Sequence, residues 1–152
     1  MFRHILVPLD QSAYSERALP YAQWVAKTTG AQVSLLCAVT RITPPDLPEV
    51  AVLDELSQKR AELYLQKRAE AVRAAGISDV RTAPRCGDPA SSIADYAQET
   101  GADLIVMSTH GMGATGRHAL GSVALKVLMA APCPVLMVRI QEEGRIAMTA
   151  GQ

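Results

Sequence analysis

Five short runs of hydrophobic residues predict strands, over residues 4–10, 32–39, 79–86, 102–108 and 134–140. Four of these runs are almost continuously apolar, as strands covered on both faces must be. The run at 79–86 instead alternates polar and apolar residues and contains Pro84, which suits a strand at the edge of a sheet. We therefore expect one sheet, with its third strand at an edge.

The segments between these runs carry apolar residues every three or four positions, which predicts helices with apolar stripes over residues 18–29, 61–72, 93–100 and 124–131. Pro20 lies one turn inside the first of them, so we expect an irregular start or a kink there. Residues 40–49 form the one long irregular connection. Strands alternating with helices of this length predict right-handed βαβ units. The expected fold class is α/β, an open five-stranded parallel sheet with helices on both faces.

Composition narrows the class of protein. The 152 residues predict a single domain over 1–140, and residues 141–152, which lack periodicity, are expected to form a disordered tail. Lysine plus arginine equals aspartate plus glutamate at 15 each, and aromatic residues make up 4%, so we expect no nucleic-acid partner. No apolar run approaches ~20 residues and no signal peptide is visible, so no membrane association is expected. The three widely spaced cysteines suit buried thiols in a reducing cytoplasm.

The glycine-rich loop after the fourth strand allows two interpretations. Residues 111–116 match G-x-G-x-x-G, the pattern of dinucleotide sites. That pattern requires a helix at the glycines and an acidic residue ~20 positions later, whereas the helical pattern starts at Gly121 and residues 136–137 are apolar. We therefore reject it. The alternative frame joins residues 108–111 at the end of a strand to Gly121-Ser122 at the start of a helix, where a phosphate would bind.

The topology predicts where a ligand would lie. In open parallel sheets, ligands bind at the carboxyl ends of strands, where the winding reverses. Asp10, Val39 and Ser108 end the first, second and fourth predicted strands, so we expect these three tips to converge. The helix after Gly121 would point its free N–H groups and positive dipole end into the same crevice.

Several of these residues fit either a binding role or a structural role. Gly111 and Gly121 would let the backbone approach an anion, or would only permit a turn. Ser122 could donate to a phosphate oxygen or cap a helix, and Asp10 could bind a ligand or cap the first helix. His110 could donate to a phosphate or hold the loop by bonding backbone.

Catalytic signals are weak. No Gly-Lys-Ser/Thr sequence occurs, which excludes Walker-type hydrolysis. No nucleophile–base pair, carboxylate dyad or zinc-ligand spacing is visible, so we assign no catalytic residue and no metal-binding site. The basic pairs at 59–60 and 67–68 are interpreted as a solvated helix face.

These segments, in this order, resemble the universal stress protein family over essentially residues 2–140. The resemblance rests on residues 5–10 with Ser12, 87–90, 102–111, 120–123 and 131–138. The nucleotide-binding branch of that family carries Gly-x2-Gly-x9-Gly-Ser/Thr. Gly111, Gly121 and Ser122 match it, while Ser108 stands at the first glycine. The usual Asp-Gly-Ser after the first strand is Asp10-Gln11-Ser12 here.

The resemblance implies an adenine-nucleotide α-hydrolase-like fold with strand order 3-2-1-4-5. It implies ATP as the ligand, with AMP or ADP as alternatives, and Mg²⁺ or Mn²⁺ on the phosphates. Asp10 would bind the ribose hydroxyls or the metal, and Val39 would pack against adenine. Both Val39 and Met107 also fit ordinary strand core. The other implied contacts are Pro8 and Leu9 for the base, Met107 and Ser108 for the ribose, and Gly111, Gly121, Ser122 and Val123 for the phosphates.

Three functions follow as alternatives: a nucleotide-responsive stress or regulatory binding protein, a non-nucleotide-binding stress protein that works by protein contacts, and a slow ATPase. An unknown regulatory protein would be the partner. An apolar edge strand must be covered, and the family pairs this strand with a second copy, so we expect a homodimer through residues 134–140. Its interface would use either Val135, Met137 and Arg139 or Leu136, Val138 and Ile140.

Overall fold

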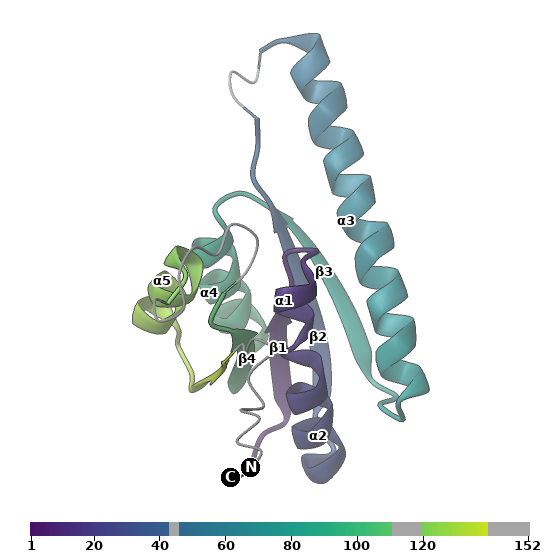
Figure 1. The fold of residues 1–152 in the computed structure, drawn as a ribbon, viewed down its shortest axis with the longest axis vertical. Coiled ribbons are helices and arrows are strands. Elements are labelled where there is room, and N and C mark those ends of the chain that lie inside the picture. The colour runs from purple at the N-terminus through teal and green to yellow at the C-terminus, as the bar shows by residue number, and fades with distance from the viewer. Residues whose placement is uncertain (43–45, 111–119, 140–152) are drawn as a thin grey trace, which may run out of the picture.

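The computed structural model describes residues 1–42, 46–110 and 120–139 (Figure 1). Its sheet is fully parallel, with strand order β3-β2-β1-β4-β5, so the predicted topology is confirmed. The winding reverses between β1 and β4, and β3, which contains Pro84, lies at an edge as expected. The strands are β1 (His4–Pro8), β2 (Gln32–Val39), β3 (Val80–Cys86), β4 (Leu104–Ser108) and β5 (Val135–Val138).

Helices cover both faces of the sheet. One face packs against α2 and α3 through a core that includes Leu19, Leu65 and Val72, and the other packs against α4 and α5 through Ile93 and Val127. Figure 1 shows α3 and α5 at opposite sides of the sheet. The helices are α1 (Ala13–Glu16), α2 (Leu19–Thr29), α3 (Pro48–Ala74), α4 (Pro89–Thr100) and α5 (Ser122–Ala130).

The structure corrects two helix predictions. The first predicted helix is preceded by a separate short helix, α1, and Pro20 lies in the first turn of α2, where its missing N–H has no role. The helix α3 begins at Pro48 and is much longer than its predicted stripe over 61–72. Its first turns stand beyond the sheet (Figure 1) and expose Val52, Leu53 and Leu56, so only the later turns show a buried period.

The predicted strand ends also shift by one or two residues. Asp10 leaves the sheet and enters the turn before α1, although Leu9 N–H still donates to the Leu36 carbonyl at 2.7 Å. The strand β5 ends at Val138, while Ile140 and the predicted tail over 141–152 lie outside the described residues. Within the described residues, none of the helices has the length and apolar character needed to cross a lipid bilayer.

A buried polar cluster connects β1, β2 and α4 at the amino end of the sheet. His4 Nε2 and Ser34 Oγ lie 2.7 Å apart, and the Tyr96 hydroxyl donates to the same oxygen at 3.3 Å. The Asp103 carboxylate accepts the backbone N–H groups of Arg3 and His4. Burial lowers the pKa of His4, so its imidazole is neutral in the folded protein at neutral pH.

Candidate functional site

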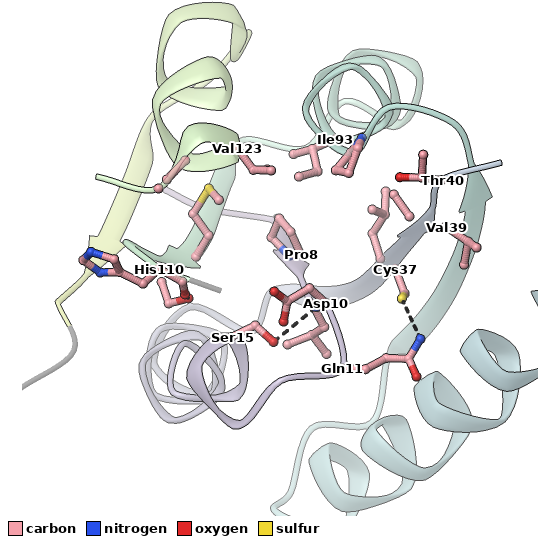
Figure 2. Close-up of a pocket in the computed structure, with 18 of the residues that line it drawn as sticks. Pro8, Asp10, Gln11, Ser15, Cys37, Val39, Thr40, Ile93, His110 and Val123 are labelled. Carbon is pink, nitrogen blue, oxygen red and sulfur yellow. Dashed lines mark hydrogen bonds between the residues drawn. The ribbon is translucent and has the colours of Figure 1, made fainter. Parts of the chain in front are cut away.

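A pocket of about 630 Å³ opens at the carboxyl ends of β1, β2 and β4. Figure 2 shows Asp10 at its centre, with His110 on one side and Cys37 and Val39 on the other. The structure places every predicted site residue in its lining except Gly111, which lies outside the described residues. These lining residues are Pro8, Leu9, Asp10, Val39, Met107, Ser108, His110, Gly121, Ser122 and Val123.

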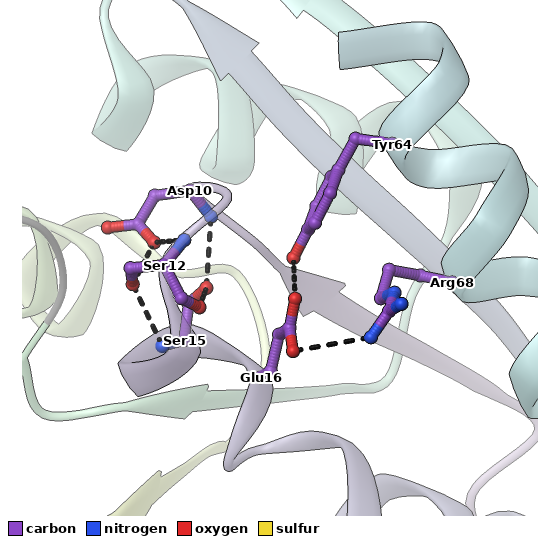
Figure 3. A network of polar contacts seen from close by, with 6 residues as sticks. All are labelled: Asp10, Ser12, Ser15, Glu16, Tyr64 and Arg68. Atoms are coloured by element: carbon purple, nitrogen blue, oxygen red, sulfur yellow. Dashed lines mark hydrogen bonds and ion pairs between the residues drawn. The ribbon is translucent and has the colours of Figure 1, made fainter. Parts of the chain in front are cut away.

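The turn after β1 holds the Asp10 carboxylate in place (Figure 3). Asp10 Oδ1 accepts the backbone N–H of Ser12 at 3.0 Å and also the Ser12 hydroxyl. The cap of α1 is Ser12, whose Oγ accepts the Ser15 N–H at 3.1 Å. The Asp10 N–H donates to Ser15 Oγ at 3.2 Å. Asp10 is therefore not the helix cap, and its side chain is oriented by the cap into the pocket.

Gln11 adopts a backbone conformation that usually requires glycine. Its φ is +67°, and no other non-glycine residue in the described ranges has a positive φ. This left-handed conformation costs about 1–2 kcal/mol for a residue with a Cβ. Its Nε2 donates to Cys37 Sγ at 3.9 Å across the pocket wall. Burial raises the pKa of that thiol, and Cys37 is the fully buried cysteine, whereas Cys86 and Cys133 are half-buried, contrary to the expectation for all three.

The tip of β4 directs its polar side chains toward its own loop. Ser108, which takes the place of the family's first glycine, donates from Oγ to the His110 carbonyl at 2.5 Å. His110 Nδ1 lies 2.9 Å from Thr109 Oγ1, so the histidine bonds a side chain rather than the backbone it was expected to hold. Its Nε2 is buried and has no hydrogen-bond partner within the part of the chain that the structure describes.

The start of α5 presents free donors to the pocket. The first helical bond runs from Leu125 N–H to the Gly121 carbonyl at 3.0 Å, which leaves the N–H groups of Ser122, Val123 and Ala124 without acceptors in the helix. No side chain of the described residues caps this end. All three residues line the pocket. Gly121, rather than Ser122, is the N-cap residue, so the capping role considered for Ser122 is wrong.

Gly121 is required by a close backbone contact. Its N–H donates to the Thr109 carbonyl at 2.8 Å. A Cβ at this position would lie 3.1 Å from that carbonyl oxygen and 3.8 Å from the His110 Cα. The glycine thus brings the helix start against the tip of β4, which is what aims the free N–H groups at the pocket.

Sequence reasoning missed the contribution of α3. Lys59 and Arg60 are both exposed, in keeping with the expected solvated face, but Arg60 and Ser57 also line the pocket, which was not expected. No local pattern could reveal this, because the pocket wall is reached only by the early turns of a helix whose true start was not predicted. Gln11, Cys37 and Thr40 also line the pocket and were not assigned.

The second basic pair contains another contact that the sequence concealed. Arg68 Nη1 lies 3.3 Å from Glu16 Oε2, and the Tyr64 hydroxyl donates to Glu16 Oε1 at 2.7 Å (Figure 3). Burial, followed by the Glu16 carboxylate, raises the pKa of Tyr64. This network joins α1, directly after the Asp10 turn, to the middle of α3.

The described pocket lining contains few groups that could bind a metal ion. Asp10 is the one carboxylate among the described lining residues. The described ranges contain no cluster of three or more His, Cys, Asp or Glu side chains that could hold a metal ion. A metal at Asp10 would therefore need most of its ligands from bound phosphate and water, as Mg²⁺ commonly does.

The parallel sheet in this order, with its pocket where the winding reverses, is that of the adenine-nucleotide α-hydrolase-like folds, the class to which similar solved structures belong. The family model described as the Universal stress protein family matches residues 1–139. The chain belongs to the universal stress protein family.

Relatives of known sequence and structure agree with this assignment. A universal stress protein of Thermus aquaticus is 37% identical over 139 residues, which cover 91% of this chain and 100% of that protein. The solved universal stress protein UspA from Lactobacillus plantarum is 29% identical, with a TM-score of 0.83 over 91% of this chain and 98% of that one. A universal stress protein solved in complex with cAMP is 25% identical, with a TM-score of 0.72 over 90% of this chain and 97% of that one.

Proposed function

We propose that this protein binds an adenine nucleotide, in the first place ATP, in the pocket between α5 and the tip of β1. The observation that carries the proposal is the set of free N–H groups of Ser122, Val123 and Ala124, which open onto the pocket that contains Asp10. A helix start of this kind attracts phosphate through its donors and its dipole. The bound nucleotide would then control the protein's assembly or its regulatory partner.

The roles of the lining residues follow from the two ends of the pocket. The phosphates would lie at Ser122 and Val123, near Gly111, with His110 Nε2 as a further donor in the tautomer that protonates it. The Asp10 carboxylate would accept the ribose hydroxyls beside Met107 and Ser108, or would ligate a Mg²⁺ or Mn²⁺ ion on the phosphates. The base would pack on the apolar surface of Val39, Pro8 and Leu9.

Two observations support an adenine nucleotide over a protein-only function. The hydroxyl of Ser108 donates to the His110 carbonyl, so the serine that replaces the motif glycine already has its hydroxyl bonded within its own loop. The relative solved with cAMP shows that a member of the family with this fold accommodates an adenine nucleotide. AMP and ADP remain alternatives to ATP, and hydrolysis is not part of the proposal.

The proposal includes a homodimer through β5 in the cytoplasm. The strand β5 is an edge strand and Leu136 on it is exposed, whereas Val138 lies in the core of its own chain and is unavailable to a partner. Two strands of this kind would cover each other around a two-fold axis. The three free cysteines suit a reducing compartment.

The test begins with mass spectrometry of any nucleotide released when the purified protein is denatured, followed by calorimetric titration with ATP, ADP and AMP. Asp10→Asn should weaken ATP binding by about 10- to 150-fold, because a charged acceptor of the ribose hydroxyls is lost. Asp46→Asn, an exposed position outside the pocket, is the matched control. Absence of any binding at millimolar ATP, or equal affinity in both variants, would contradict the proposal.

A further inference from the structure

The end of the pocket farthest from α5 is formed by α3 and the Asp10 turn. Ser57 and Arg60 stand three residues apart on α3, on one helix face, and both line the pocket. Gln11 and Thr40 line it from the neighbouring turn and from the end of β2. Because α3 and α5 lie at opposite sides of the sheet (Figure 1), this end is separate from the free N–H groups.

The positive charge of Arg60 is not neutralised within the described residues. The adjacent Lys59 pairs with Glu55 at 3.8 Å, and Arg68 pairs with Glu16, but Arg60 has no such ion pair. The positions three and four residues before and after it are Leu56, Ser57, Leu63 and Tyr64, none of which is acidic. Arg60 is exposed and lines the pocket without an ion pair in the described ranges, so its guanidinium is available to a ligand.

The residues at the α3 end of the pocket suit contact with the face of a nucleotide base. The described lining contains no Phe, Tyr or Trp, and its one imidazole, that of His110, lies on the opposite side of the pocket from Val39 (Figure 2), so a base resting on Val39 has no aromatic side chain to cover its other face. A guanidinium is planar, weakly hydrated and stacks on π systems, which an ammonium does not. The carboxamide of Gln11, which also lines the pocket, offers an amide donor and a carbonyl acceptor for the edge of the ring.

Resting on the proposed nucleotide function, we propose that Arg60 is a specificity-determining residue whose guanidinium lies on the open face of a purine base. The larger π surface of a purine gives it the stronger contact, so the site prefers purine over pyrimidine nucleotides. Ser57 and Gln11, which line the same pocket, stand beside the base. The phosphates, at the other end of the pocket, make no contact with Arg60.

The test compares ATP, CTP and inorganic triphosphate by calorimetric titration at one fixed ionic strength, using wild type, Arg60→Met, Arg60→Lys and the neighbouring control Lys59→Met. Arg60→Met should weaken ATP binding by about 2- to 30-fold, the range expected for loss of a cation–π contact. Arg60→Lys should weaken it by a smaller factor, because an ammonium keeps the charge but lacks the planar stacking surface. The preference for ATP over CTP should shrink, triphosphate affinity should stay unchanged, and Lys59→Met should behave as wild type.

Three results would overturn the inference. An equal loss for ATP, CTP and triphosphate would mean that Arg60 acts on the phosphates as a charge. Full recovery of ATP binding in Arg60→Lys would show that planarity is irrelevant. Unchanged ATP affinity in Arg60→Met, with binding still sensitive to Asp10→Asn, would refute the role of Arg60 and leave the proposed function intact, whereas a wild-type protein that binds none of the three ligands would refute both.

Discussion

The free N–H groups at the start of α5 can be tested by proline, because the pocket lies at the first helical residue. Ser122 is that residue, and its N–H makes no helix bond. Gly121 before it has φ −60° and ψ 154°, the extended conformation that a residue preceding proline requires. Proline is favoured at the first helical position. Ser122→Pro therefore removes an N–H and a hydroxyl from the pocket while the helix is preserved, and Ser122→Ala removes the hydroxyl alone.

The expected losses follow from charge-assisted hydrogen bonds, each of which contributes about 1.5–3 kcal/mol. Ser122→Ala should weaken ATP binding by about 10- to 150-fold. Ser122→Pro loses a second donor, so its binding should be weaker again by a similar factor. Ser122 is exposed, which places both losses toward the lower end of their ranges. The free energy of unfolding should change by less than about 0.5 kcal/mol in either variant.

The assay is calorimetric titration with ATP, together with urea unfolding to verify that each variant is folded. Gly121→Val is a poor alternative, because a Cβ there would crowd the Thr109 carbonyl and move the whole helix start. Ser122→Pro that binds ATP as tightly as Ser122→Ala would show that the Ser122 N–H does not contact the phosphates. The placement of the phosphates at α5 would then be wrong.

Three further predictions concern stability and assembly. Glu16→Ala leaves the Tyr64 hydroxyl without its acceptor, so it should lower the free energy of unfolding by about 1–3 kcal/mol in urea titrations, whereas Glu55→Ala in an exposed pair should cost less than about 0.5 kcal/mol. Burial lowers the pKa of His4, so the unfolded chain binds a proton at this imidazole at a higher pH than the folded protein does. The free energy of unfolding should therefore decrease as the pH falls below about 6.5. A His4→Asn variant with the same dependence of unfolding free energy on pH would refute this role of His4. Leu136→Asp should shift the light-scattering mass from dimer to monomer, and a monomeric wild type at high micromolar concentration would end the dimer proposal.

Local sequence signals located the elements that depend on neighbouring residues. Local residues set both ends of α4, since Asp88 accepts the Ser91 N–H at its start and Gly101 adopts the left-handed conformation at its end. The alternating run with Pro84 predicted the edge position of β3. The same signals failed for α3, since its early turns stand beyond the sheet and bury no continuous stripe.

The sequence pattern by itself determined the five strands along the chain, the four longer helices between them and the residues near the strand tips, because periodicity and turn chemistry act within a few residues of backbone. Tertiary structure alone decided which distant side chains share the pocket. Gln11 meets Cys37 across 26 positions and Glu16 meets Tyr64 across 48. Arg60 lines the pocket only because α3 is long and packs on β2 and β3 in a position that brings its early turns to the carboxyl ends of the strands. Such contacts depend on how whole elements pack, and no local pattern of residues encodes that packing.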